Sequence, residues 1–149
     1  MATKVIDSWA LIALFNEEAA ADEVEKLLHA ATSGRHTLLM HVINWGEIFY
    51  TTMRRGGESA AKSIATDIGQ MPITIVEATN FDLLRQAAVF KATKKLSYAD
   101  CFGAALAKLR RAEFVTGDPE FKAVESEVAI HWLSDRRRQK GTPAKTKTI

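Results

Sequence analysis

Short apolar runs alternate with amphipathic segments along most of the chain. Runs rich in aliphatic and β-branched side chains predict strands at 4–6, 37–40, 73–76, 114–116 and 128–132. Crowded apolar residues predict a buried helix at 9–15, and apolar positions three or four residues apart predict helices at 18–31, 44–55, 58–69, 80–94 and 97–111. This alternation predicts an α/β fold with three layers, α/β/α, in which helices cover both faces of a mostly parallel central sheet of four or five strands.

Polar residues and glycines mark where the predicted helices begin and end. Asn44, Ser97 and either Thr79 or Asn80 are predicted N-caps, because their side-chain oxygens can accept hydrogen bonds from free backbone N–H groups. The Gly56-Gly57 pair predicts a break between two helices. Phe81 is expected on the apolar face of its helix, together with other apolar residues of that segment.

The charge distribution divides the chain into a predicted domain, residues 1–135, and a basic tail, residues 136–149. The tail holds six cations and no acid, namely Arg136, Arg137, Arg138, Lys140, Lys145 and Lys147. Without it the overall charge of +2 becomes −4, with 14 basic against 18 acidic residues. The tail has no apolar periodicity, which predicts disorder. It could attract phosphate groups or an acidic partner, or it could simply aid solubility.

The single cysteine, Cys101, excludes a disulfide within the chain and a structural zinc site of several cysteines. Its place on an apolar helix face predicts a buried, inert thiol, and Tyr98 and the three tryptophans are expected in the core. No segment approaches the roughly 20 apolar residues of a membrane span. Asp7 interrupts what would be the core of a signal peptide. We therefore expect a cytoplasmic protein without membrane association.

Four acidic residues follow the predicted strands. Asp7 ends the first strand, Glu47 lies early in the helix after the second, Asp100 begins a helix after the third, and Asp118 follows the fourth. Each has a structural explanation of its own, as a helix cap, a favourable charge near a helix N-terminus or an Asx-turn. Together, however, they are expected to converge at one edge of a parallel sheet, where open α/β folds bind ligands.

Such a group of carboxylates predicts a cation site. Like charges repel and raise one another's pKa values, so the cluster is expected to persist only with cations bound. Carboxylate oxygens suit Mg²⁺ or Mn²⁺ better than zinc or copper.

The sequence resembles the PIN-domain nucleases, and among them the VapC-type toxins of toxin–antitoxin pairs. The resemblance rests on segments 5–15, 44–47, 96–102 and 114–121, in their order, spacing and flanking residues. By this resemblance the family's four acids fall on Asp7, Glu47, Asp100 and Asp118. The hydroxyl found beside the last acid falls on Thr116, and Asn44 stands where many relatives carry serine or threonine. The basic tail extends beyond the family's usual end.

The resemblance implies a PIN-like fold and metal-dependent hydrolysis of RNA phosphodiesters, with Mg²⁺ or Mn²⁺ held by the four acids. Thr116, Ser8 and Asn44 would support the metal ligands, and Lys94 and Lys95 are candidates for phosphate contacts. It also implies the toxin of a type II toxin–antitoxin pair, a homodimer that is silenced by a cognate antitoxin.

Three other interpretations stay open from the sequence. The protein could be an RNA-processing nuclease without an antitoxin, or a non-catalytic module that binds RNA or protein. An aspartyl-phosphate enzyme with Asp7 as nucleophile predicts a second acid two residues later, where Trp9 stands instead.

Overall fold

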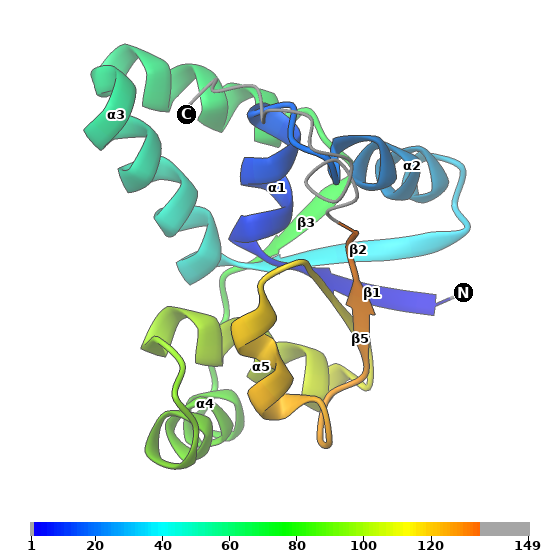
Figure 1. Ribbon diagram of the computed structural model, residues 1–149, viewed down its shortest axis with the longest axis vertical. Helices are drawn as coiled ribbons and strands as arrows, with labels where there is room; N and C mark the ends of the chain where they lie inside the picture. The colour runs from blue at the N-terminus through cyan, green and yellow to red at the C-terminus, as the bar shows by residue number, and fades with distance from the viewer. Residues whose placement is uncertain (1, 135–149) are drawn as a thin grey trace.

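The computed structural model describes residues 2–134 and contains one five-stranded parallel sheet (Figure 1). The strand order is β3-β2-β1-β4-β5, and all four pairings are parallel. The strands are β1 (Ala2–Ile6), β2 (His36–His41), β3 (Ile73–Val76), β4 (Glu113–Thr116) and β5 (Ile130–Trp132). The predicted α/β class and the predicted parallel sheet are thus confirmed, and β1 lies at the centre of the sheet.

Helices cover both faces of the sheet. They are α1 (Ser8–Phe15), α2 (Ala21–Thr32), α3 (Val42–Gly69), α4 (Phe81–Thr93), α5 (Tyr98–Arg110) and the short 3₁₀ helix η1 (Pro119–Val124). The first three pack on one face, and α4, α5 and η1 pack on the other (Figure 1). Among the described residues, no helix is long and apolar enough to cross a membrane.

Alternating strand residues build two separate cores. Val5 faces α4 and α5, whereas its neighbour Ile6 faces α1, α2 and α3. In the neighbouring strands, Leu39 lies opposite Val5 and shares its core, and Phe114 does the same on the other side. Because side chains alternate along a strand, the continuous apolar runs of the sequence supply both cores at once.

A kink at Gly57 divides α3 into two arms. Gly57 has φ 86° and ψ 178°, a conformation that residues with a Cβ rarely adopt. The predicted break between two helices is therefore confirmed, and each arm keeps its own direction (Figure 1).

The predicted N-cap of the first arm is wrong, because α3 begins at Val42 and His41 caps it. The Nδ1 atom of His41 accepts a hydrogen bond from the backbone N–H of Ile43 at 3.1 Å, and its Nε2 lies 3.1 Å from Thr79 Oγ1. The buried ring also stacks on Phe102, with 5.0 Å between ring centroids, and burial lowers the pKa of His41. Asn44 consequently lies inside the first turn, where its side chain is available for another role. The other predicted caps, Asn80 and Ser97, are confirmed.

Two predicted core positions are exposed instead. Phe81 is 79% exposed, because the buried stripe of α4 passes through Leu83, and two residues of helix turn the chain by about 200°. Tyr98 is 43% exposed, because it lies at the first position of α5, although its ring contacts Phe102. The tryptophans are only partly buried, whereas Cys101 is fully buried as predicted.

Two further predictions concern the start of the second helix and the C-terminal tail. The second helix begins at Ala21 rather than at 18, after a turn in which Glu17 adopts a positive φ of 53°. The predicted disordered tail, 136–149, lies outside the described residues.

Candidate metal centre

Asp7 connects the central strand to the first helix and is almost fully buried, with 2% exposure. Its Oδ1 accepts the backbone N–H of Ala10 at 3.0 Å and thereby caps α1. Its Oδ2 accepts the hydroxyl of Thr116 at 2.7 Å, from the end of the adjacent strand β4. The helix-cap role considered from the sequence is therefore real, and it fixes this carboxylate at the carboxyl edge of the sheet.

The environment of Asp7 opposes its negative charge. Burial is the main cause that raises its pKa to about 8, and the charges of Asp100 and Asp118 raise it further. The hydrogen bonds from Thr116 and Ala10 lower the pKa without compensating for burial. At neutral pH and without a cation, this carboxyl group is therefore mostly protonated.

Thr116 and Asp118 are positioned by the turn after β4. Thr116 is fully buried, and its Oγ1 accepts the backbone N–H of Asp118 at 3.1 Å while its hydroxyl donates to Asp7. Asp118 in turn caps η1, since its Oδ1 accepts the backbone N–H of Glu120 at 2.9 Å. The predicted supporting role of Thr116 thus corresponds to a hydroxyl that joins two of the four acids.

Asp100 lies in the first turn of α5, next to the Ser97 cap. The backbone N–H of Asp100 donates to Ser97 Oγ at 3.1 Å. Burial raises the pKa of Asp100 to about 6, and the charges of Glu47, Asp118 and Glu120 add to the effect. Its carboxylate is therefore electrostatically linked to three other acids.

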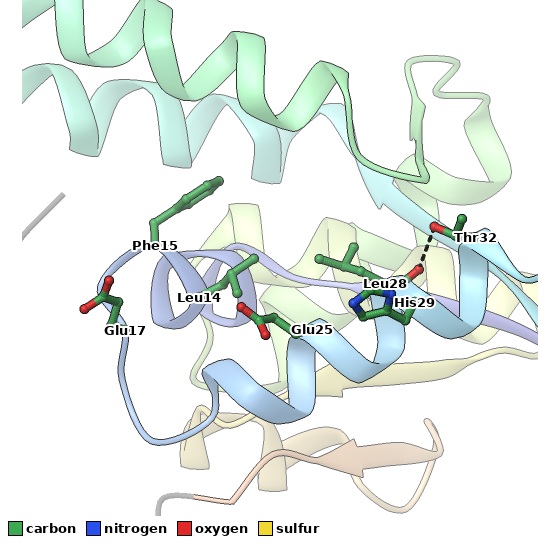
Figure 2. A pocket seen from close by; sticks show the side chains of 7 residues that line it. All are labelled: Leu14, Phe15, Glu17, Glu25, Leu28, His29 and Thr32. Carbon is green, nitrogen blue, oxygen red and sulfur yellow. Dashed lines mark hydrogen bonds between the residues drawn. The ribbon is translucent and has the colours of Figure 1, made fainter.

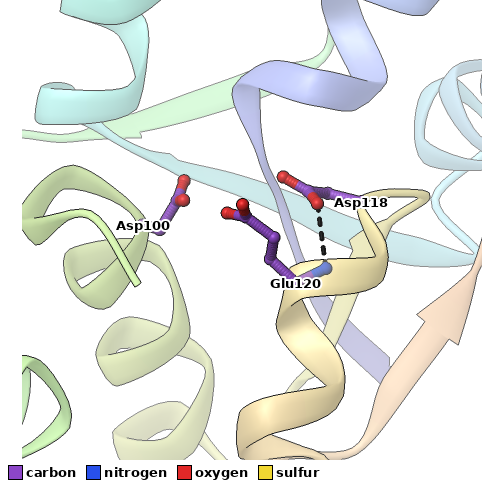
Figure 3. A group of neighbouring side chains, drawn as sticks. All are labelled: Asp100, Asp118 and Glu120. Atoms are coloured by element: carbon purple, nitrogen blue, oxygen red, sulfur yellow. Dashed lines mark hydrogen bonds between the residues drawn. The ribbon is translucent and has the colours of Figure 1, made fainter. Parts of the chain in front are cut away.

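One acid of this cluster was not among the sequence candidates. Carboxylate oxygens of Asp100, Asp118 and Glu120 lie within 4.8 Å of one another, close enough for one cation to contact all three (Figure 3). Glu120 comes from η1 and points toward Asp100 across the gap between η1 and α5 (Figure 3). In the sequence, the only signal for including Glu120 in the group was its spacing of two residues from Asp118.

Glu47, whose charge acts on Asp100, is held by two neighbours. Its Oε1 accepts the Ser8 hydroxyl at 3.2 Å and the Asn44 amide at 3.0 Å. The same amide nitrogen donates to the backbone carbonyl of Ala99 at 3.1 Å, so Asn44 joins α3 to the N-terminus of α5. Two of the three residues predicted to support the acids, Ser8 and Asn44, therefore contact Glu47.

The close approach of α3 and α5 depends on Gly103. A Cβ atom at this position would lie 2.8 Å from Asn44 Oδ1 and 3.0 Å from Phe114 Cε1. Asn44 is 1% exposed, and its Oδ1 has no hydrogen-bond partner. The side chain is thus fixed through its donors alone, which point it at Glu47 and Ala99.

Comparison with known proteins identifies the family. The sequence model of the PIN domain matches residues 4–127, most of the chain. The chain belongs to the PIN domain family. Membership supports a nuclease and therefore a hydrolase. No curated protein sequence matches the chain.

Several solved structures share the fold of this chain. A chain of VapBC2 from Rickettsia felis, bound to a DNA fragment from its promoter, has 14% identity and a TM-score of 0.67, over 89% of this chain and 99% of that chain. VapC20 from Mycobacterium tuberculosis, a toxin that cleaves the sarcin-ricin loop, has 20% identity and a TM-score of 0.65, over 81% of this chain and 94% of that chain. FitAcB from Neisseria gonorrhoeae has 15% identity and a TM-score of 0.61, over 85% of this chain and 95% of that chain. At these identities the similarity shows the PIN fold.

The acidic residues of this PIN domain fit a hard divalent cation. All the charged donors are carboxylate oxygens, which Mg²⁺ and Mn²⁺ prefer. Two of the acids, Asp7 and Asp100, have raised pKa values, mainly because burial opposes their negative charge and further because other acids lie nearby. The structure brings Asp100 and Asp118 together with Glu120, whereas Asp7 and Glu47 lie outside this group and interact electrostatically with its members. A bound cation would relieve the repulsion among them.

Proposed function

We propose that this chain is a divalent-metal-dependent endoribonuclease and the toxin of a type II toxin–antitoxin pair. The observation that carries the proposal is the convergence of Asp100, Asp118 and Glu120 within 4.8 Å, beside the buried Asp7. The fold shared with VapBC toxins from several bacteria supports the toxin role and a cognate antitoxin as partner. RNA as substrate is supported by VapC20, whose target is the sarcin-ricin loop.

The residues divide into ligands and supports. Asp7, Asp100 and Asp118 would hold the cation, with Glu120 as a further ligand or as an acceptor for a water molecule. Glu47, which lies on α3, would add a further carboxylate to the site. Mg²⁺ or Mn²⁺, when bound, would supply Lewis-acid activation of water and stabilisation of charge at the phosphate.

The supporting residues fix the orientation of these ligands before substrate arrives. Thr116 donates to Asp7 and receives the backbone N–H of Asp118, so it sets the distance between these two acids. Ser8 and Asn44 hold one oxygen of Glu47. Partners that hydrogen-bond to metal ligands are typically worth 10- to 100-fold in affinity or activity.

The two candidate lysines, in the connection between α4 and α5, differ in their availability for phosphate. Lys94 Nζ lies 3.5 Å from a carboxylate oxygen of Glu127. Lys95 is exposed beside the N-terminus that carries Asp100. We therefore favour Lys95 for a contact with the RNA backbone.

Cleavage of an RNA panel tests the proposal. Single-stranded RNA and structured tRNA are incubated with Mg²⁺, Mn²⁺ or EDTA, using the wild type, Asp7→Asn, Asp100→Asn and the control Asp67→Asn, an exposed acid of α3. We expect cleavage only with a divalent ion, loss in both site variants and retention in the control. Activity that persists in EDTA or in the site variants indicates a contaminating ribonuclease. Absence of cleavage together with calorimetry that detects no acid-dependent ion binding contradicts the proposal.

The toxin role has its own test. A small neighbouring gene that encodes a DNA-binding protein is expected, and its product should suppress cleavage when mixed with the chain. Cleavage that this product leaves unchanged favours an RNA-processing nuclease. Size-exclusion chromatography with light scattering checks the proposed homodimer, and a monomer at all concentrations contradicts it.

A further inference from the structure

The described part of the chain ends in a fixed position against α2. The backbone N–H of Leu133 donates to the carbonyl of Thr116 at 2.8 Å, and that of Ser134 donates to Glu23 Oε1 at 3.2 Å. The other carboxylate oxygen of Glu23 lies 3.1 Å from His131 Nε2. The following segment, 135–149, therefore starts at the side of α2 that carries Glu23.

The surface next to this starting point is acidic. The acidic segment, defined as residues 17–25, holds five acids and no base, namely Glu17, Glu18, Asp22, Glu23 and Glu25. Three of them, Glu17, Asp22 and Glu25, are exposed. One lysine, Lys26, follows the segment.

The acidic segment borders an open groove between the end of α1 and α2. The groove has a volume of about 570 Å³. It is lined by Leu14, Phe15, Glu17, Glu25, Leu28, His29 and Thr32 (Figure 2). Figure 2 shows Leu14 next to the Glu25 carboxylate, with Leu28 farther along α2 beside His29. An apolar floor beside carboxylates suits lysine and arginine, whose aliphatic stems pack on apolar groups while the cation stays at the rim.

The C-terminal segment that follows Ser134 has a charge opposite to that of the acidic segment. Residues 136–149 carry six lysines and arginines and no acid. It therefore offers one cation more than the number of acids in the acidic segment.

The segment is also long enough. Successive helix positions are about 100° apart, so Asp22 lies between Glu23 and Glu25 around the circumference of α2. Half the circumference of a helix about 11 Å wide is about 17 Å, which five or six extended residues span. An extended chain that starts after Ser134 is therefore long enough to reach the groove from about Lys140 onward.

We propose that residues 136–149 dock in cis on the acidic segment and the adjoining groove between α1 and α2. The covalent link keeps the local concentration of the tail in the millimolar range, so individually weak surface ion pairs can act together. These pairs are exposed and are therefore screened by salt. The inference does not depend on the proposed nuclease function, since none of the acids of the metal centre is involved.

Trypsin cleavage in the tail, after Arg136–Arg138 and Lys140, measures docking in the full-length chain. The acidic-segment variant carries Glu17→Gln, Asp22→Asn and Glu25→Gln. The matched control carries Glu58→Gln, Asp67→Asn and Glu77→Gln, three exposed acids elsewhere. We expect the acidic-segment variant to be cut at least about threefold faster than the wild type and the control at about 25 mM NaCl. The difference should vanish at about 500 mM NaCl, where the Debye length is below about 5 Å.

Zero-length carbodiimide cross-linking identifies the occupant. Wild-type chains with ¹⁴N and ¹⁵N are mixed at low salt, and we expect the tail lysines to couple to the acidic segment within one chain. Cross-links between differently labelled chains indicate a second copy and overturn docking in cis. Cross-links spread over acids of the whole surface overturn the site. Equal cleavage rates in all three proteins, or a tail that is shielded only after an RNA oligonucleotide is added, overturn the proposal as well. Equal melting temperatures of the variants confirm that they are folded.

Discussion

Replacing Asp7 by asparagine tests the electrostatic argument for the metal centre without any activity assay. Asparagine has the same shape but does not titrate. In the wild type, the pKa of Asp7 rises from 3.8 to about 8 on folding, mainly through burial. Because a shift of one unit corresponds to about 1.36 kcal/mol, keeping this group protonated while the unfolded chain ionises costs about 4 kcal/mol at pH 7.

The sign of the pH dependence follows from the raised pKa. Below about pH 4, Asp7 is protonated in both states and does not reduce stability. As the pH rises toward 8, only the unfolded state releases the proton, so the wild type loses stability relative to Asp7→Asn. Above about pH 8 the difference levels off. Any effect of the new amide on the Thr116 hydrogen bond adds a constant, so the pH dependence itself is diagnostic.

Urea unfolding followed by circular dichroism measures this difference from about pH 4 to 9 in EDTA. We expect the stability of Asp7→Asn relative to the wild type to rise by about 4 kcal/mol between pH 4 and 7. Asp67→Asn should show no such trend. Adding Mg²⁺ should stabilise the wild type more than Asp7→Asn, because a ligand stabilises the state that binds it. A difference between wild type and Asp7→Asn that stays the same from pH 5 to 8 would refute the reasoning.

Three further substitutions probe how the site is supported. In Gly117→Ala the new Cβ would lie 2.2 Å from the Trp9 ring, so we expect a loss of about 1–3 kcal/mol in urea unfolding and a shifted tryptophan fluorescence maximum. In Thr116→Val the hydroxyl donor to Asp7 is lost, and calorimetry should show about 10- to 100-fold weaker Mg²⁺ binding, whereas Thr116→Ser retains it. In Ser97→Ala the cap of α5 is lost, which should cost about 1 kcal/mol in thermal unfolding.

Local patterns were sufficient to predict the sheet but not every helix start. The strands were predictable because each is a short apolar run whose alternate residues enter the two cores. The cap of α3 was not, since Asn44 is a common cap residue and His41 is not. His41 takes this position through contacts with Thr79 and Phe102, which are distant in sequence. Only the tertiary structure brings these partners together.

The same division applies to the candidate metal centre. That Asp7, Asp100 and Asp118 come near one another was predictable, because strand ends and helix starts of a parallel sheet meet at one edge. Glu120 was not, because its distance to Asp100 depends on how η1 packs beside α5. Asn44 was predicted to support the site, and only the structure shows that its amide joins Glu47 to α5.

Helix capping and cation binding are compatible functions of one carboxylate here. Each oxygen of a carboxylate has about two acceptor positions. Asp7 uses one on Oδ1 for the cap and one on Oδ2 for Thr116, so each oxygen keeps a position for a cation. The two hydrogen bonds also fix the orientation of the side chain, which lowers the entropic cost of binding an ion. The structural explanation of Asp7 therefore strengthens the functional one, since a carboxylate held by its helix cap is already oriented as a ligand.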